Sequence, residues 1–351
     1  MNRFASIVLT SLVIALAGSC EHKELCYYHP HTAPVRVNVD WSRFPMETPT
    51  GMTAYSYLIG DADRNVYRMI SHNINYITLD LEAGFFNTIV FNQSETEFGS
   101  FEFVNLDDYN SAQVRVLQVK SNWYESKSNG TKVGTEPEWL AVGRAERIEV
   151  TEAMVDQAEK EYLEQNKDII SRSGTKSYHD VGTITPTSVV KQVEFNVYGK
   201  GLYNLRSARA AMEGMAEGRY LSTGKPFPTR VAHTLDTWSM TTEPNDPSSG
   251  YITSIVSTFG LPEGHTGKAT ENKFSISLLL VDNETILTYD YNIGDLLVEL
   301  NQLSDLEEKI VINLELPERL PDVLPVGGSG GGFSADVDDW GDEITTEIPI
   351  M

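Results

Sequence analysis

The chain has 351 residues, 40% of them hydrophobic and 10% aromatic, a composition typical of a folded protein with room for two ordinary domains. Its formal net charge of −23 would repel a phosphate backbone, which excludes nucleic-acid binding as a function. Two cysteines are too few for a disulfide framework, so we expect sheets and hydrophobic cores to hold the fold together.

The first element is a leader over residues 1–19. Arg3 supplies one positive charge, residues 4–17 are mostly apolar, and small residues lead into Cys20. The apolar run is too short to span a bilayer and has the proportions of a signal peptide. Its ending resembles the bacterial lipoprotein signal, which implies that Cys20 is lipidated and anchors the mature chain in the outer membrane. An ordinary cleaved signal peptide and an uncleaved N-terminal anchor are the alternatives.

A polar lead-in, residues 20–34, precedes the first expected domain, residues 35–182. Apolar and polar residues alternate over residues 35–41, which predicts a half-buried strand. Residues 77–92 predict two strands that pair as a hairpin around a turn at Gly84. Residues 114–119 predict a further strand. Thr151 and the apolar spacing that follows it predict a helix over residues 151–166.

A polar linker, residues 171–186, leads into the second expected domain, residues 183–320. Residues 205–218 are rich in alanine and methionine and predict a short helix. Alternating patterns predict the strands of this domain, at residues 193–197, 251–259, 274–280, 286–291 and 310–316. Several short strands with only one or two short helices indicate a mainly β fold of two β-sandwiches in tandem.

Residues 321–351 form a separate C-terminal segment. Glycines crowd residues 327–332, which predicts a flexible tether. Beyond it, one side of a short predicted strand is formed by Ile344, Thr346, Ile348 and Ile350. Such a strand needs a sheet edge to pair with. It would pair within its own domain, be donated to another subunit in an assembly, or remain a frayed tail.

Several stretches resemble a known family of Bacteroidales lipoproteins. They are the leader with residues 24–31, the strand at 35–41, residues 77–92, residues 206–226 and the Thr-Phe-Gly-Leu-Pro run at 258–262. The family is DUF5119, which is related to the fimbrillin-like subunits of the type V pilus. The resemblance implies two transthyretin-like, Greek-key β-sandwich domains and export as a lipoprotein.

The resemblance also implies a mode of assembly. Polymerising pilins of that superfamily lose their first strand to a protease specific for Arg or Lys, and a strand from a partner fills the groove. Arg36 and Arg43 lie where such a cut would fall, although Arg36 is inside a predicted strand. A polymerising subunit, an anchor and a tip protein all remain open.

No catalytic, cofactor or metal site is predicted. The Gly-x-Ser-x-Gly match at residues 327–331 lies in low-complexity sequence and not in a strand-to-helix elbow. Residues 336–347 resemble a calcium loop, but Trp340 stands where an oxygen ligand is required. The candidate metal ligands nearest to one another are His22, Cys26, His29 and His31. A polar lead-in beside the lipid is the simpler interpretation of that cluster.

The sequence therefore predicts a cell-surface lipoprotein, not an enzyme, that acts as a fimbrial structural, anchor or adhesion subunit. Its expected partners are other pilus subunits or copies of itself, through β-strand addition, the outer membrane, through the lipid at Cys20, and ligands on host or bacterial surfaces. The alternative is a surface glycan-binding lipoprotein with a β-sandwich fold. Trp123, in a polar stretch, is the tryptophan we expect to be exposed for that role.

Overall fold

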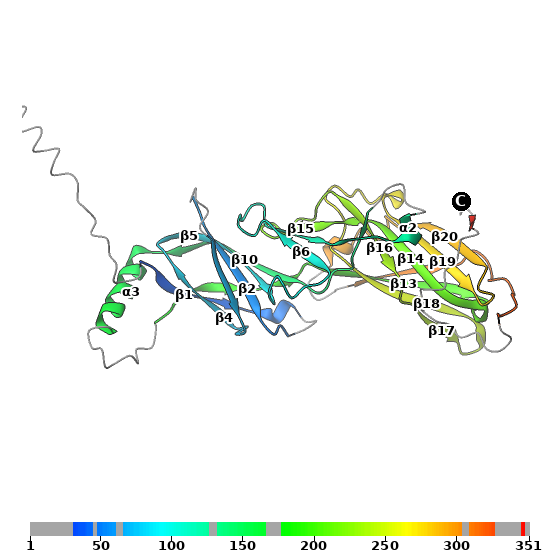
Figure 1. The fold of residues 1–351 in the computed structure, drawn as a ribbon, viewed down its shortest axis with the longest axis horizontal. Coiled ribbons are helices and arrows are strands. Elements are labelled where there is room, and N and C mark those ends of the chain that lie inside the picture. The colour runs from blue at the N-terminus through cyan, green and yellow to red at the C-terminus, as the bar shows by residue number, and fades with distance from the viewer. Residues whose placement is uncertain are drawn as a thin grey trace, which may run out of the picture.

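The computed structural model describes residues 31–44, 48–60, 66–125, 132–165, 177–303, 309–326 and 345–347. The molecule is elongated, with the N-terminal strands gathered in one half and the C-terminal strands in the other (Figure 1). Helix α3 (Glu152–Gln165) lies at one pole, and the β19–β20 end of the C-terminal half lies at the other. The prediction of a mainly β, sandwich-like chain is confirmed.

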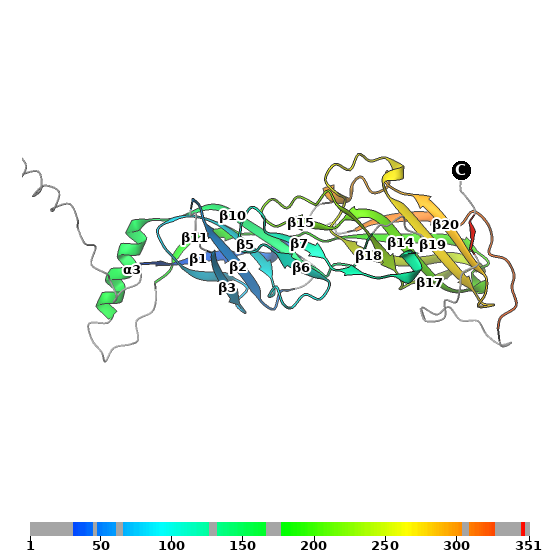
Figure 2. The same ribbon diagram turned by 45° about the horizontal axis from the view of Figure 1, so that its top comes forward.

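Two sheets face each other in the N-terminal half (Figure 2). The three-stranded sheet has the order β11 (His179–Ile184), β1 (Ala33–Val39), β4 (Tyr76–Leu81). The five-stranded sheet has the order β12 (Thr187–Ser188), β10 (Ala141–Val150), β5 (Gly84–Asn92), β2 (Met52–Leu58), β3 (Val66–Ser71). Apolar side chains from both sheets form one core between them.

The predicted hairpin over residues 77–92 is wrong. Both strands exist, but β4 pairs with β1 and β5 pairs with β2 and β10, in the other sheet. Ile77 and Leu79 on β4 lie in the same core as Phe86 and Val90 on β5. The chain crosses from one sheet to the other at Gly84 because both strands bury one apolar face. Facing each other across the core buries both faces at once.

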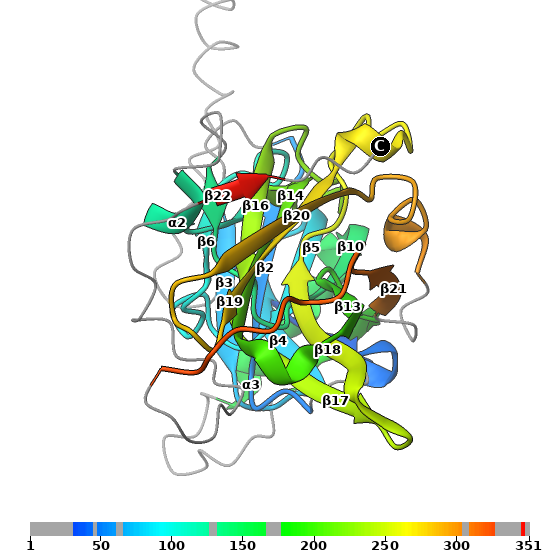
Figure 3. The ribbon, with the colours of Figure 1, turned by 90° about the vertical axis from the view of Figure 1, so that its right-hand side faces the viewer.

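The C-terminal half is also built from two sheets. One has the order β17 (Ser239–Glu243), β18 (Asp246–Thr258), β13 (Lys191–Lys200), β21 (Lys309–Glu315). The other has the order β22 (Thr345–Glu347), β20 (Ile286–Asn292), β19 (Lys273–Leu280), β14 (Leu205–Ala216), β16 (Arg230–Leu235), β9 (Val133–Gly134), β8 (Gln118–Val119). Phe195 and Phe274, fully buried, stack across the sandwich with ring centroids 4.0 Å apart. Figure 3 views this half from its end.

The predicted helix over residues 205–218 is wrong, since this stretch is the long strand β14. It pairs with β19 on one side and β16 on the other. Both of its faces are covered: Ala210 packs into the core of the sandwich, whereas Ala211 packs against Trp123 outside it. A strand buried on both faces has no polar alternation, and pairing with two neighbours outweighs the helix propensity of alanine and methionine.

The two halves share a core at their junction. A fifth, small sheet, with the order β15 (Gly218–Tyr220), β7 (Gln113–Val116), β6 (Phe101–Val104), joins strands from both predicted domains. Leu221, Val231 and Phe259 pack into the same cluster as Phe91 and Phe101. The domain boundary at residue 183 therefore stays a prediction.

Helix α3 confirms the predicted helix at 151–166, and the hydroxyl of Thr151 accepts a hydrogen bond from the backbone N–H of Met154 at 3.3 Å. The predicted linker at 171–186 is partly wrong. Its described part contains β11, which pairs in parallel with β1 and belongs to the N-terminal sandwich. Among the described residues, no helix is long and apolar enough to cross a membrane.

Candidate functional site

The candidate site is strand β1 and the groove that it fills. β1 lies in the centre of its sheet, pairing with β4 in antiparallel fashion and with β11 in parallel. Its inward side chains are Ala33, Val35, Val37 and Val39, none more than 7% exposed. They alternate with outward Arg36 and Asn38, as the sequence pattern predicts. The predicted strand runs to residue 41, but β1 ends at Val39.

The groove under β1 is apolar. Its floor is the shared core of the N-terminal half, which includes Met52, Phe86 and Val90 from the opposite sheet. Its walls are β4 and β11, whose facing backbone groups would lose their partners if β1 were absent. Unpaired strand edges and a vacant apolar groove are costly in water, so a second strand of the same pattern would be bound there.

Arg36 is held within the sheet. Its backbone pairs with Thr78 on β4 and Asp180 on β11. Its guanidinium lies 3.8 Å from the carboxylate of Asp180 and stacks over the rings of Tyr76 and Tyr178, at 4.5 and 5.1 Å. A protease that binds its substrate as an extended strand needs a free backbone edge on that strand. Both edges of β1 are already paired at Arg36, so the folded chain does not offer this bond for cleavage.

Arg43 lies outside the sheet. It ends a one-turn 3₁₀-helix, Trp41–Arg43, which follows β1 and begins at a cap formed by Asp40. The side chain of Arg43 is exposed, and the next residue, Phe44, is 4% exposed. Hydrogen bonds from Ser42 lower the pKa of Asp40, so this carboxylate cap persists at neutral pH. Of the two predicted processing residues, only Arg43 lies at a surface turn.

The C-terminal strand is placed on an edge of its own half. β22 pairs in parallel with β20, with Thr345 to Glu347 opposite Ile286 to Thr288 (Figure 3). Of the four predicted donor residues, Thr346 lies in this pairing, whereas Ile344, Ile348 and Ile350 fall outside the described residues. Pairing within its own domain is the first of the three predicted outcomes. The strand occupies three residues of a seven-residue partner, so the contact is short.

Trp123 does not match its prediction. It is 9% exposed and packs with Tyr124, Val133 and Ala211 on the outer face of β14. The guanidinium of Arg209 lies 5.6 Å from its ring centroid. Sequence position alone suggested exposure because the surrounding residues are polar, but the short helix α2 (Asn122–Glu125) folds onto the C-terminal sheet.

A pocket in the N-terminal half was not predicted from sequence. It lies where β2 ends, beside the loop between β6 and β7, and is lined by Tyr57, Leu58, Ile59, Gly60, Val66, Asn87, Asp107, Asp108, Tyr109 and Asn110. The only sequence signal was the Asp-Asp-Tyr-Asn run, which reads as an ordinary polar turn.

The remaining predicted site residues lie outside the described part of the chain. They are Cys20, the cluster of His22, Cys26 and His29, and the acidic segment around Trp340. His31 is described, and the described residues contain no grouping of His, Cys, Asp and Glu able to hold a metal ion.

Comparisons with known proteins agree with this architecture. The model of a family described as a domain of unknown function, DUF5119, matches residues 19–236. No functionally curated protein matches the sequence. The structure of a candidate adhesin from Bacteroides ovatus is similar with a TM-score of 0.52 and 12% identity, over 83% of this chain and 94% of that one.

Two further solved structures are similar at lower scores. A candidate adhesin from Bacteroides thetaiotaomicron gives a TM-score of 0.49 and 10% identity, over 81% of this chain and 92% of that one. The fimbrial anchor protein Mfa2 from Porphyromonas gingivalis gives a TM-score of 0.46 and 10% identity, over 81% of this chain and 90% of that one. At 12% identity, the likeness to the first adhesin shows a common fold.

Proposed function

The chain belongs to the DUF5119 family, whose model covers more than half of it, and from this premise we propose that it is a cell-surface fimbrial or adhesion subunit. It is held at the outer membrane by lipid on Cys20 and binds other subunits, or copies of itself, by strand addition. This use of the fold follows the description of its structural neighbour as a candidate adhesin. Its affinity comes from main-chain pairing and apolar side chains, so the protein needs no catalysis.

The observation that carries the proposal is the position of β1. β1 is the first strand of the chain, and it lies at the centre of its sheet, where both of its edges are paired. Removing it leaves a groove that accepts a strand with a small or branched apolar residue at every second position. The C-terminal segment approaches this pattern with Ile344, Thr346, Ile348 and Ile350, in which the branched but polar Thr346 takes one of the four positions.

One cut would change the role of the chain. Cys20 and β1 both precede Arg43, so cleavage after Arg43 separates the lipid and β1 from the rest of the chain, and the groove opens once the freed β1 is displaced by a second strand. An uncut chain is an anchor with a filled groove, and a cut chain is a polymerising subunit. Processing at Arg43 thus decides between the two roles.

The test uses protein purified from cells with its native leader. Mass spectrometry of the mature N-terminus should find an acylated Cys20, a start at Phe44, or both populations. Cys20→Ser should abolish lipid labelling and membrane retention. A mature N-terminus that begins elsewhere in the leader, without lipid, would refute the anchoring part of the proposal.

Assembly is tested by deletion of residues 327–351. Wild-type protein that has been processed after Arg43 should form multimers that survive SDS without boiling, and the deleted chain should not. Arg43→Gln is the matched variant, because it keeps the donor segment but also keeps β1 in the groove, so it too should stay monomeric. Unchanged multimers in the deleted chain would refute strand donation by this segment.

Trp123, the residue expected to be exposed for glycan binding, is buried in the structure. Trp123 is packed against β14, so a saccharide has no access to the ring in this structure. Of the other described tryptophans, Trp238 is buried, and Trp41 and Trp139 are partly buried and pack against hydrophobic cores. The fimbrial proposal is therefore the one that the geometry supports.

A further inference from the structure

We propose that the chain forms a homodimer in which the outer edge of β21 pairs, in antiparallel fashion, with β21 of a second copy. β21 is the last strand in the order β17, β18, β13, β21, and among the described strands it pairs only with β13. Its other edge therefore carries backbone N–H and C=O groups that have no strand partner in the described part of the chain. This surface is separate from the β1 groove and from the C-terminal donor segment.

β21 lacks the features that usually keep an edge strand from pairing. Its seven residues follow β13 in an unbroken register, and the residues between Lys309 and Glu315 carry no charge. Val311, in the middle of this stretch, is 47% exposed. The other edge strand of the sheet, β17, has five residues, and its register with β18 shifts next to Glu243. A regular, uncharged edge is a template for another strand, whereas a short or irregular edge is not.

The backbone groups at the outer edge of β21 belong to alternate residues. The N–H of Leu316 donates to the carbonyl of Tyr198 on β13 at 2.9 Å, so this residue directs its backbone towards β13. Successive residues of a strand direct their backbone groups to opposite sides, so Val311 and Asn313 direct theirs to the outer edge. Both side chains are exposed on the outer face of the sheet.

The sequence of β21 is complementary to itself in the antiparallel direction. A two-fold axis through Ile312 places Lys309 opposite Glu315 of the second copy, and Val311 opposite Asn313. Val311 and Asn313 then form hydrogen-bonded pairs, whereas Ile312 meets its own copy in a non-hydrogen-bonded pair. A register shifted by two residues would lose both Lys–Glu pairs. Exposed charge pairs add little affinity, so their main effect is to select this register.

Two groups at the ends of this edge already have partners, and the dimer keeps both contacts. The ammonium group of Lys309 lies 2.6 Å from the carboxylate of Glu194 on β13 and has further N–H donors for a second carboxylate. The hydroxyl of Tyr291 donates to the carbonyl of Glu315 at 2.9 Å, and this carbonyl has a second lone pair. Neither contact involves Val311 or the centre of the strand.

Apolar side chains on the inner face also gain cover in the dimer. Ile310 and Leu314 are only partly buried against the core of the C-terminal half, whereas Ile312 is 3% exposed. Pairing about Ile312 places Ile310 opposite Leu314 of the second copy, which removes more of both side chains from water. One strand pair buries less area than a standard protein–protein interface, so we expect a reversible dimer with a micromolar Kd.

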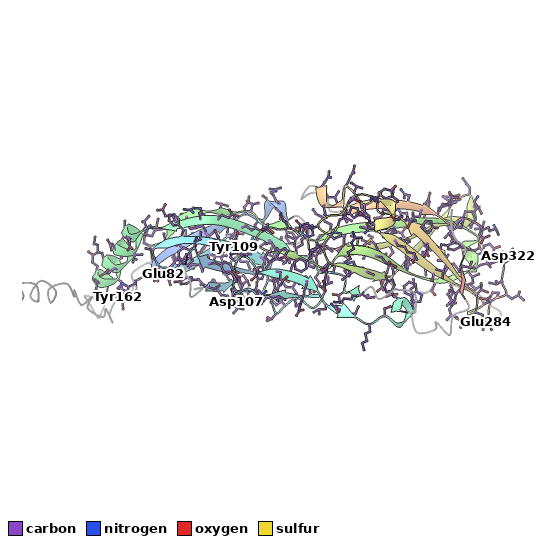
Figure 4. All side chains as sticks on the ribbon, turned by 90° about the horizontal axis from the view of Figure 1, so that it is seen from above. Glu82, Asp107, Tyr109, Tyr162, Glu284 and Asp322 are labelled. Carbon is purple, nitrogen blue, oxygen red and sulfur yellow. The ribbon has the colours of Figure 1, made fainter. Side chains whose placement is uncertain are left out.

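The antiparallel pairing sets the direction of the two molecules. β13 and β21 run in parallel from the junction, where Val190 is buried, to the far pole, where Lys200 accepts a hydrogen bond from Leu320. Figure 4 labels Asp322 at that pole and Tyr162 on α3 at the opposite one. In the dimer the C-terminal halves overlap and the two α3 poles point away from each other. With each chain anchored at its N-terminus, a step that rests on the proposed lipid, the dimer joins two facing surfaces.

The first test is sedimentation equilibrium of the mature chain with Cys20→Ser, Cys26→Ser and Arg43→Gln, so that lipid, native thiols and strand donation do not contribute. At about 100 μM and physiological salt, which screens the net negative charge, we expect a monomer–dimer equilibrium that SDS abolishes. Failure here would overturn the β21 pairing and leave anchoring and strand donation untouched.

Val311→Pro should weaken this dimer at least about tenfold, because it removes an N–H that has no partner on β13. Val311→Thr keeps the N–H and the β-branched shape, so it is the matched control and should dimerise like the unchanged chain. Glu315→Lys sets Lys309 against a like charge and should weaken the dimer without touching the backbone. Dimers of unchanged strength in the proline and lysine variants would overturn the proposal.

A cross-link tests the register. Opposed Cα atoms in a non-hydrogen-bonded pair lie about 4.5 Å apart, within disulfide range, so Ile312→Cys should form a covalent dimer on oxidation. Ile310→Cys, on the same face, should not, because its own copy lies about 13 Å away. A cross-link at Ile310→Cys but not at Ile312→Cys would refute this register. Beads that carry the chain by its N-terminus should aggregate, and a dimer in solution without aggregation would refute the facing-surface step alone.

Discussion

A protease specific for arginine should cut the folded chain after Arg43 about a thousand times faster than after Arg36. Opening the bond at Arg43 unwinds one 3₁₀ turn and exposes Phe44, at a cost of about 2 kcal/mol. Opening the bond at Arg36 removes β1 from its sheet and exposes three buried valines, about 2 kcal/mol each. The difference of about 4 kcal/mol corresponds to about three powers of ten in the population of the open state.

The assay is limited proteolysis at low protease concentration, with each new N-terminus quantified over time by mass spectrometry. Arg43→Gln should remove the early fragment that begins at Phe44, and Arg36→Gln should leave it unchanged. In denaturant the two bonds should be cut at similar rates. Comparable cutting at both bonds in the native protein would refute the role assigned to β1 in protecting Arg36.

Two further predictions concern buried side chains. Trp123→Ala should lower the free energy of unfolding by about 3 kcal/mol in chemical denaturation, since the ring is packed against β14, and an unchanged stability would contradict that packing. Burial lowers the pKa of His233 to about 4, so the unfolded chain binds the proton more readily between pH 6.5 and 4. Stability should therefore fall by up to about 3 kcal/mol as the pH falls through that window, and His233→Gln should flatten this slope.

The local patterns predicted the elements that bury one face. β1 and α3 both follow from periodicity, because valines at every second position and apolar residues at helical spacing each mark a single buried side. Periodicity did not predict β14 as a strand. Its two faces contact different layers, so its alanines carry no alternation, and only the pairing with β16 and β19 makes it a strand.

Relations between distant segments could not be predicted. The separation of β4 and β5 into two sheets depends on partners elsewhere in the chain, not on the turn between them. The pocket where β2 ends joins residues from four separate stretches of the chain, so no one stretch of sequence signals it. The position of Trp123 likewise depends on β14, a strand that comes much later in the chain.

The direction of β1 has a mechanical consequence. β1 runs along the long axis of the molecule, and its ladder bonds to β4 and β11 lie across that axis (Figure 1). A pull between a lipid at Cys20 and a partner at the far pole would load these bonds in shear, so that many must break together. In the proposed surface assembly, the pairing of β1 with β4 and β11 would therefore resist a pulling force most strongly next to the anchor.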